Sequence, residues 1–167
     1  MKNFFGLAAL AFSLAGCLGY SIGPIKPNYM ADVHTISVRT FKNETLIPRL
    51  EELVTSTVVK QFQQDGTYKV GNDENADAIL TAEIANISRS PARSLQGNVL
   101  STTEFNLAMR VKYRLTARDG RVIAPGEVTG TTSYFVDADI VTDERQALPL
   151  AIDELAQHLV TQLSEGW

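Results

Sequence analysis

Apolar and polar residues alternate along EFNLAMRVKYRLTA, residues Glu104–Ala117, and this pattern constrains the fold more than any other segment. Side chains two residues apart lie on the same face of a strand, so this pattern predicts a β-strand with two unlike faces. One face packs against a core and the other meets water. The apolar face carries Phe105, Leu107, Met109, Val111, Tyr113 and Leu115, and the polar face carries Glu104, Asn106, Ala108, Arg110, Lys112, Arg114 and Thr116.

The segments around this strand supply the rest of a sheet. Arg118–Arg121 contains the Asp-Gly pair that is typical of a hairpin turn, and Val122–Val136 is predicted to return as the next strand. Further strands are predicted at Val33–Phe41, Thr67–Val70 and Ala78–Ile87, with a polar turn at Lys42–Thr45 and a long loop at Ser88–Ser101.

Two amphipathic helices are predicted to cover the apolar face of the sheet. The first opens with Pro48 and ends at Gly66, where a glycine suits a left-handed cap. The second follows an acidic loop, is capped by Thr142 or Asp143, and runs almost to the C-terminus. We therefore predict an α+β fold, a two-layer sandwich with two helices on one face of a mostly antiparallel sheet of four or five strands.

The N-terminus has the layout of a bacterial lipoprotein signal. Lys2 provides a positive start, an apolar stretch follows, and Leu14-Ala15-Gly16-Cys17 fits the lipobox that precedes lipidation. The apolar stretch is shorter than the roughly 20 residues that span a bilayer. We expect a signal peptide at residues 1–16, a lipidated N-terminus and tether at 17–32, and one α/β domain at 33–167. Cys17, the only cysteine, is expected to carry S-diacylglycerol and an N-acyl chain, which give stable anchoring.

Composition and motifs argue against several classes of function. A formal net charge of −4 gives no overall attraction to nucleic acid. His34 and His158 are the only histidines, and no catalytic, phosphate-binding or metal-binding motif is present in the sequence. We predict a protein that is not an enzyme and that needs no metal and no cofactor besides its covalent lipid.

Five basic residues are candidates for contacts with anionic lipid or with a partner. Arg110, Lys112 and Arg114 repeat on one strand face about 6.6 to 7 Å apart, which suits a row of phosphates or the wall of a polar lumen. A solvated sheet face explains the same row. Arg89 and Arg93 fall in the predicted loop, where binding residues often lie.

Several short pieces, in this order, resemble one protein family, LptE, the lipopolysaccharide-assembly lipoprotein of the outer membrane. The resemblance extends from Cys17 to the C-terminus and is greatest to the divergent, non-enteric branch of the family. The pieces are the lipobox with Gly19-Tyr20, Ile36-Ser37-Val38-x-x-Phe41-x-Asn43-x-Thr45, Pro48-x-Leu50-Glu51, Gln63-x-Asp65-Gly66-Thr67-Tyr68, Ala76-Asp77-Ala78-Ile79-Leu80, and a helical end, Ala147–Trp167.

The resemblance implies an outer-membrane, periplasm-facing lipoprotein that plugs the lumen of a large β-barrel translocon, LptD. It further implies help with assembly of the barrel and binding of lipopolysaccharide during delivery to the outer leaflet. Arg93 lies in the loop that matches the family's lipid-contacting basic residues. A second basic position of the family has no equivalent here, since Glu127 and Val128 occupy that region.

The sequence is also compatible with a different function in the cell envelope. Lipoproteins that activate another periplasmic machine, such as a peptidoglycan synthase, share a similar first strand and α/β domain. Such an activator needs a long tether, and residues 17–32 offer a short one.

Overall fold

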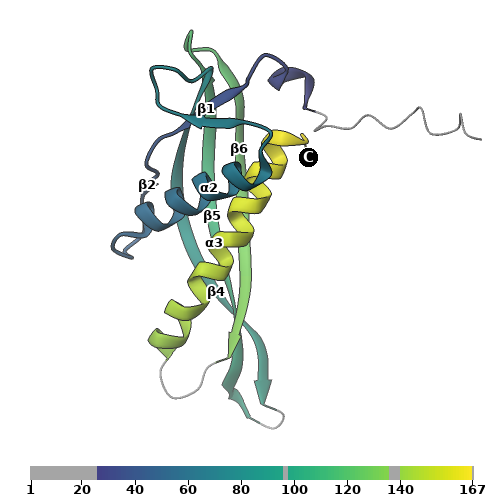
Figure 1. The fold of residues 1–167 in the computed structure, drawn as a ribbon. Helices are drawn as coiled ribbons and strands as arrows, with labels where there is room; N and C mark the ends of the chain where they lie inside the picture. The colour runs from purple at the N-terminus through teal and green to yellow at the C-terminus, as the bar shows by residue number, and fades with distance from the viewer. Residues whose placement is uncertain (1–25, 96–97, 136–139, 167) are drawn as a thin grey trace, which may run out of the picture.

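The computed structural model describes residues 26–95, 98–135 and 140–166, so the lipobox and Cys17 lie outside the described residues (Figure 1). The elements run in the order η2 (Asn28–Met30), β1 (Thr35–Val38), β2 (Lys42–Asn43), α2 (Leu50–Asp65), β3 (Lys69–Gly71), β4 (Ala78–Leu95), β5 (Asn98–Ala117), β6 (Val122–Phe135) and α3 (Ile140–Ser164).

The sheet has six strands and is mixed, which corrects the prediction of a mostly antiparallel sheet of four or five strands. Its order is β3-β1-β4-β5-β6, with β2 also paired to β4. The β4-β5-β6 part is antiparallel, whereas β1 runs parallel to both β3 and β4, and β2 runs parallel to β4. Helix α2 carries the chain from β1 and β2 to β3, and a helical crossover of this kind returns the chain in the same direction.

Strands β4 and β5 extend well past the helices as a long two-stranded arm (Figure 1). The prediction of a loop at Ser88–Ser101 is therefore wrong for most of its length. Arg89 pairs with Leu107 and Arg93 with Glu104, with irregular register next to Pro91. Proline has no backbone N–H to donate, which explains a bulge at this point. The arm carries no alternating apolar face because no helix covers its end.

Two other predicted boundaries are also corrected. The polar turn at Lys42–Thr45 begins with the two-residue strand β2, which pairs with Glu83 and Ile84. Helix α3 begins at Ile140, before the predicted caps Thr142 and Asp143. The predicted C-terminal cap of α2 is confirmed, because Gly66 is left-handed (φ 74°) and its N–H bonds the carbonyl of Phe62.

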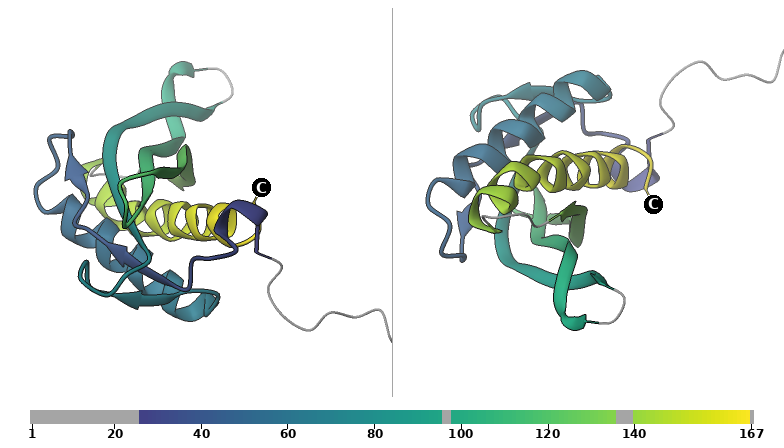
Figure 2. Two further views of the ribbon diagram at one scale, coloured as in Figure 1. Left: turned by 90° about the horizontal axis from the view of Figure 1, so that it is seen from above. Right: turned by 90° about the horizontal axis from the view of Figure 1, so that it is seen from below.

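Both helices cover one face of the sheet, as predicted, and they pack against each other (Figure 2). The predicted register of β5 is confirmed: Leu107, Met109, Val111, Tyr113 and Leu115 are buried, and Arg110, Lys112 and Arg114 are exposed. From the helices, Val54, Val58, Phe62, Ile152, Leu155 and Leu159 complete the core.

Residues 26–32 lie against the domain rather than apart from it. Met30 is fully buried, and the Lys26 ammonium lies 4.9 Å from the centre of the Tyr68 ring. The Tyr68 hydroxyl donates to the carbonyl of Leu163 near the end of α3. The start of the described chain and its C-terminal end are thus close together (Figure 1).

Helix α3 also bonds the free edge of the sheet. The Glu154 carboxylate accepts hydrogen bonds from the backbone N–H and the hydroxyl of Thr131 on β6. The His158 ring bonds the carbonyl of Thr129 at 2.9 Å. Gly130 between them is buried against α3, and a Cβ there would lie 2.0 Å from the carbonyl oxygen of Ala151. The helix and the edge strand therefore approach each other backbone to backbone.

Candidate binding surfaces

The polar sheet face holds the predicted row of Arg110, Lys112 and Arg114 on β5. Acidic side chains from both neighbouring strands accompany it. Arg110 lies 3.4 Å from the Glu127 carboxylate on β6, and Lys112 is in register with Glu83 on β4 and Glu127 on β6. The face therefore alternates positive and negative charge, which suits a polar protein wall better than a dense array of phosphates.

A shallow hollow of about 420 Å³ opens on this face. Lys42 at its rim bonds Glu44 at 2.5 Å, and this hydrogen bond raises the pKa of the lysine. The hollow is lined by Lys42, Thr81, Ala82, Glu83, Lys112, Tyr113 and Arg114.

Arg89 lies on the opposite side of the sheet from that row. Its guanidinium forms a bidentate ion pair with Glu144 near the start of α3, with nitrogen–oxygen distances of 2.5 and 2.8 Å. Glu144 is 8% exposed, and its hydrogen bond raises the pKa of Arg89. Arg89 thus joins the β4–β5 arm to α3.

The five candidate basic residues do not form one site. Arg110, Lys112 and Arg114 are together, and Arg89 faces the helices. Arg93 lies farther along the arm, in register with Glu104, and its side chain is outside what the structure describes.

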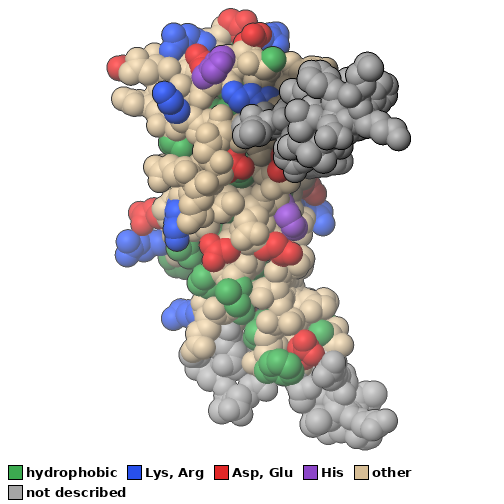
Figure 3. All heavy atoms as spheres, turned by 45° about the vertical axis from the view of Figure 1, so that its right-hand side comes forward, with side chains coloured by type: hydrophobic (Ala, Val, Ile, Leu, Met, Phe, Trp, Pro, Cys, Tyr) green, Lys and Arg blue, Asp and Glu red, His purple; other side chains and the backbone are tan. Residues whose placement is uncertain are grey.

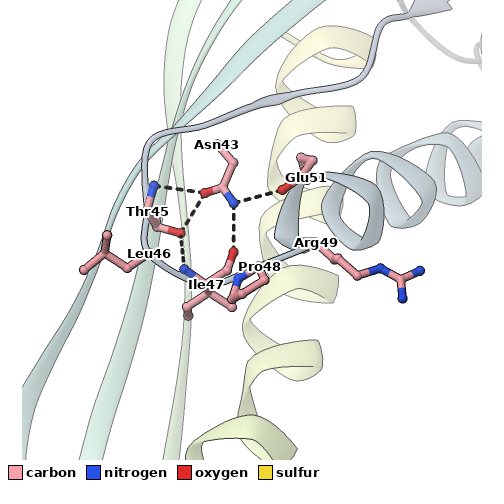
Figure 4. Close-up of a pocket in the computed structure, with 7 residues that line it drawn as sticks. All are labelled: Asn43, Thr45, Leu46, Ile47, Pro48, Arg49 and Glu51. Atoms are coloured by element: carbon pink, nitrogen blue, oxygen red, sulfur yellow. Dashed lines mark hydrogen bonds between the residues drawn. The ribbon is translucent and has the colours of Figure 1, made fainter.

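A structured loop, not predicted from the sequence, connects β2 and α2 (Figure 4). The Asn43 amide donates to the Ile47 carbonyl at 2.8 Å and to the Glu51 carboxylate at 2.9 Å. Its oxygen accepts from the N–H and the hydroxyl of Thr45, and that hydroxyl in turn accepts from the N–H of Ile47. Hydrogen bonds from its own backbone and from Asn43 lower the pKa of Glu51. The Asn-x-Thr sequence, a frequent former of side-chain turns, was the available signal.

The loop presents Leu46, whose side chain is 99% exposed. Leu46 helps to line the hollow of about 500 Å³ whose residues Figure 4 draws. It also lines two smaller hollows, of about 300 Å³ and 240 Å³, which share Leu46, Ile47 and Arg89. The first of these two also reaches Ala85, Asn86 and Ile87 on β4, and the second reaches Pro48, Glu144, Arg145 and Leu148.

Exposed hydrophobic side chains also gather over the lower half of the face drawn in Figure 3. Between β6 and α3, Phe135 and Leu150 are 67% and 58% exposed and line a hollow of about 310 Å³. Within the described ranges, no helix is long and apolar enough to cross a bilayer, and no three potential ligands gather as a metal site.

The fold recurs in solved structures that share little sequence with this chain. A minor lipoprotein from Acinetobacter baumannii is 19% identical, with a TM-score of 0.54 over 79% of this chain and 93% of that one. PelC from Paraburkholderia phytofirmans, a dodecamer, is 16% identical, with a TM-score of 0.52 over 78% and 89%. A hypothetical protein from Chlamydia trachomatis is 8% identical, with a TM-score of 0.57 over 78% and 95%.

These likenesses concern the fold alone. Comparison with curated protein sequences gives no match. The family model for lipopolysaccharide-assembly proteins, LptE, matches residues 33–163, which include the whole described sheet and nearly all of α3. The chain therefore belongs to the LptE family.

Proposed function

We propose that this protein is an outer-membrane lipoprotein that plugs and helps to assemble the β-barrel translocon of lipopolysaccharide, LptD, and assists delivery to the outer leaflet. Membership of the lipopolysaccharide-assembly family supports the general role. In this proposal the protein is not an enzyme, and the lipid on Cys17 is its only non-protein group.

The observation that carries the plug role is the uncovered polar face of the sheet. Arg110, Lys112 and Arg114 are exposed there among Glu83 and Glu127. A large barrel has a polar interior, so a domain inside it must meet polar groups with polar groups of its own. A face of mixed charge does this without a large excess of either sign.

The proposed lipid anchor limits how far the domain can lie from the membrane. Eight residues separate Cys17 from Lys26, the first residue that the structure describes, whose ammonium lies over the Tyr68 ring. A fully extended chain of that length reaches about 30 Å. The domain is thus held near the inner leaflet of the outer membrane, which raises its effective concentration at the mouth of a barrel. This short reach argues against an activator that must span the periplasm.

Lipid contacts are assigned to the arm. Arg93 remains the candidate for lipopolysaccharide phosphates. Arg89 is held by Glu144, so a phosphate at Arg89 has to share or replace that carboxylate. Arg110, Lys112 and Arg114 are assigned to the barrel wall.

Co-purification tests the proposal. We expect the lipidated chain to bring down one large outer-membrane barrel in a one-to-one complex from detergent-solubilised outer membrane. Depletion should reduce the assembled barrel and surface lipopolysaccharide. Normal barrel assembly after depletion, together with no barrel in the purified fraction, would refute the assignment.

A second experiment tests the lipid contact. Arg93→Ala should weaken lipopolysaccharide binding while barrel co-purification is retained. For Arg89, the change is paired with Glu144→Gln, because Arg89→Gln alone leaves a nearly buried carboxylate without its ion pair. Unchanged lipopolysaccharide binding in both variants would remove the arm from the proposal.

A further inference from the structure

The loop between β2 and α2 exposes a leucine side chain to solvent, although hydrogen bonds hold the backbone of the loop. Leu46 is the most exposed of the large hydrophobic side chains in the described residues, at 99%. The hydrogen bonds that fix the loop come from Asn43, Thr45 and the Ile47 backbone, and none uses the Leu46 side chain. In Figure 4 that side chain points away from the bonded residues. Leu46 therefore adds little to folding, and the bonds of its neighbours Asn43, Thr45 and Ile47 hold the loop that carries it.

The surroundings of Leu46 have the shape of an interface. Leu46 takes part in the lining of three hollows, so the knob adjoins recesses that can receive side chains from a partner. A loop whose backbone is already held by hydrogen bonds loses less conformational entropy on association than a free loop does. An apolar centre with a polar rim is the usual arrangement of a protein–protein interface.

The charges around the loop favour a protein over a lipid surface as the binding partner. Lys42 is paired with Glu44, Arg49 with Glu52, and Arg89 with Glu144. Glu51 adds a carboxylate whose pKa is lowered, so it is ionised at neutral pH. The rim has no excess of cations to attract anionic headgroups, and one leucine alone anchors weakly to a bilayer.

We propose that Leu46 is a docking knob that enters an apolar pocket on a protein partner, with the neighbouring ion pairs forming the polar rim. This rests on the proposed function, and the partner is then the translocon barrel. In this proposal the role of the Asn43-x-Thr45 motif is structural: its side-chain hydrogen bonds hold the loop that carries Leu46.

The test uses full-length lipidated protein. Leu46→Ala should weaken barrel binding about 10- to 100-fold, the effect of one buried leucine side chain. Leu150→Ala, an exposed leucine on α3, is the matched control and should bind as the unaltered protein does. Asn43→Ala keeps the knob but frees the loop, and should give an intermediate loss. Thermal melting of Leu46→Ala should be unchanged, which separates binding from folding.

A photo-crosslinking residue at position 46 identifies what the knob touches in cells. A crosslink to the barrel, together with the selective loss for Leu46→Ala, supports the proposal. If the unaltered chain captures the barrel but Leu46→Ala binds equally well, or position 46 crosslinks only to lipid, the knob is refuted and the plug function stands. If the unaltered chain captures no barrel, the plug function fails, and the choice of partner fails with it.

Discussion

Replacing Gly130 by alanine should strain the contact between β6 and α3, because the added methyl group has no room there. The new Cβ would lie 2.0 Å from the Ala151 carbonyl oxygen and 2.6 Å from both the backbone nitrogen and the Cβ of Leu155. Two of these three atoms belong to the backbone of α3. No rotamer change relieves such a clash, so the helix or the strand must move.

The size of the effect follows from these contacts. Non-bonded carbon atoms are most stable about 3.5–4.0 Å apart, so relief requires a shift of an ångström or more. Overpacking of a tight core costs about 1–3 kcal/mol. The shift also stretches the hydrogen bonds of Glu154 to Thr131 and of His158 to Thr129. With the two exposed Glu154 bonds counted together, each of these two contacts adds about 0.5–1.5 kcal/mol. We expect a total loss of about 2–6 kcal/mol.

Thermal and urea unfolding measure this loss. At about 2–4 °C per kcal/mol for a chain of this size, the Tm should fall by roughly 4–24 °C. Ser133→Ala, at an exposed position of the same strand, is the control and should melt as the unaltered protein does. A Gly130→Ala protein that melts within about 2 °C of the unaltered one would contradict the close approach of helix and strand.

Three further predictions test the core, the pH dependence and the anchor. Leu115→Ala should cost about 2–5 kcal/mol in urea unfolding, because the side chain is fully buried under the helices; a loss below about 1 kcal/mol would contradict the register. Hydrogen bonds from the backbone N–H groups of His34 and Thr35 lower the pKa of Asp77, so its contribution is present above about pH 4 and is lost as the pH falls through the lowered value. Stability measured between neutral pH and pH 2 should accordingly decline less in Asp77→Asn than in the unaltered protein, and equal declines would count against this role. Cys17→Ser should block acylation and leave an unprocessed or mislocalised chain on membrane fractionation, whereas normal attachment to the outer membrane would disprove the lipid anchor.

The sequence was sufficient to predict those elements in which buried and exposed positions alternate in a regular pattern. The alternation along β5 gave the buried and exposed faces correctly, because a strand with one covered face has a period of two residues. The helices and the Gly66 cap followed from equally local signals. The end of the β4–β5 arm has the sequence pattern of a loop because it extends beyond the helices, so no apolar face marks it as a strand.

The candidate site was harder to predict, since its contacts join distant parts of the chain. Nothing in the sequence near Arg89 indicates Glu144, which lies 55 positions later. The parallel pairing of β1 with β4 likewise depends on how α2 packs. The bonds of Asn43 are different, because they reach only residues up to eight positions away, and Asn-x-Thr before Pro48 was open to interpretation as a structured turn.

The bonds from Glu154 and His158 to β6 have a consequence for the protein before it meets a partner. Lipid-anchored chains share a plane, where they collide more often than in free solution, and an open sheet edge invites a second copy to add its own strand. A strand that joined β6 at Thr129 and Thr131 would first have to displace both side chains of α3. Helix α3 thus discourages the addition of a further strand at the centre of β6, which in the proposed lipid-anchored form would keep neighbouring copies separate.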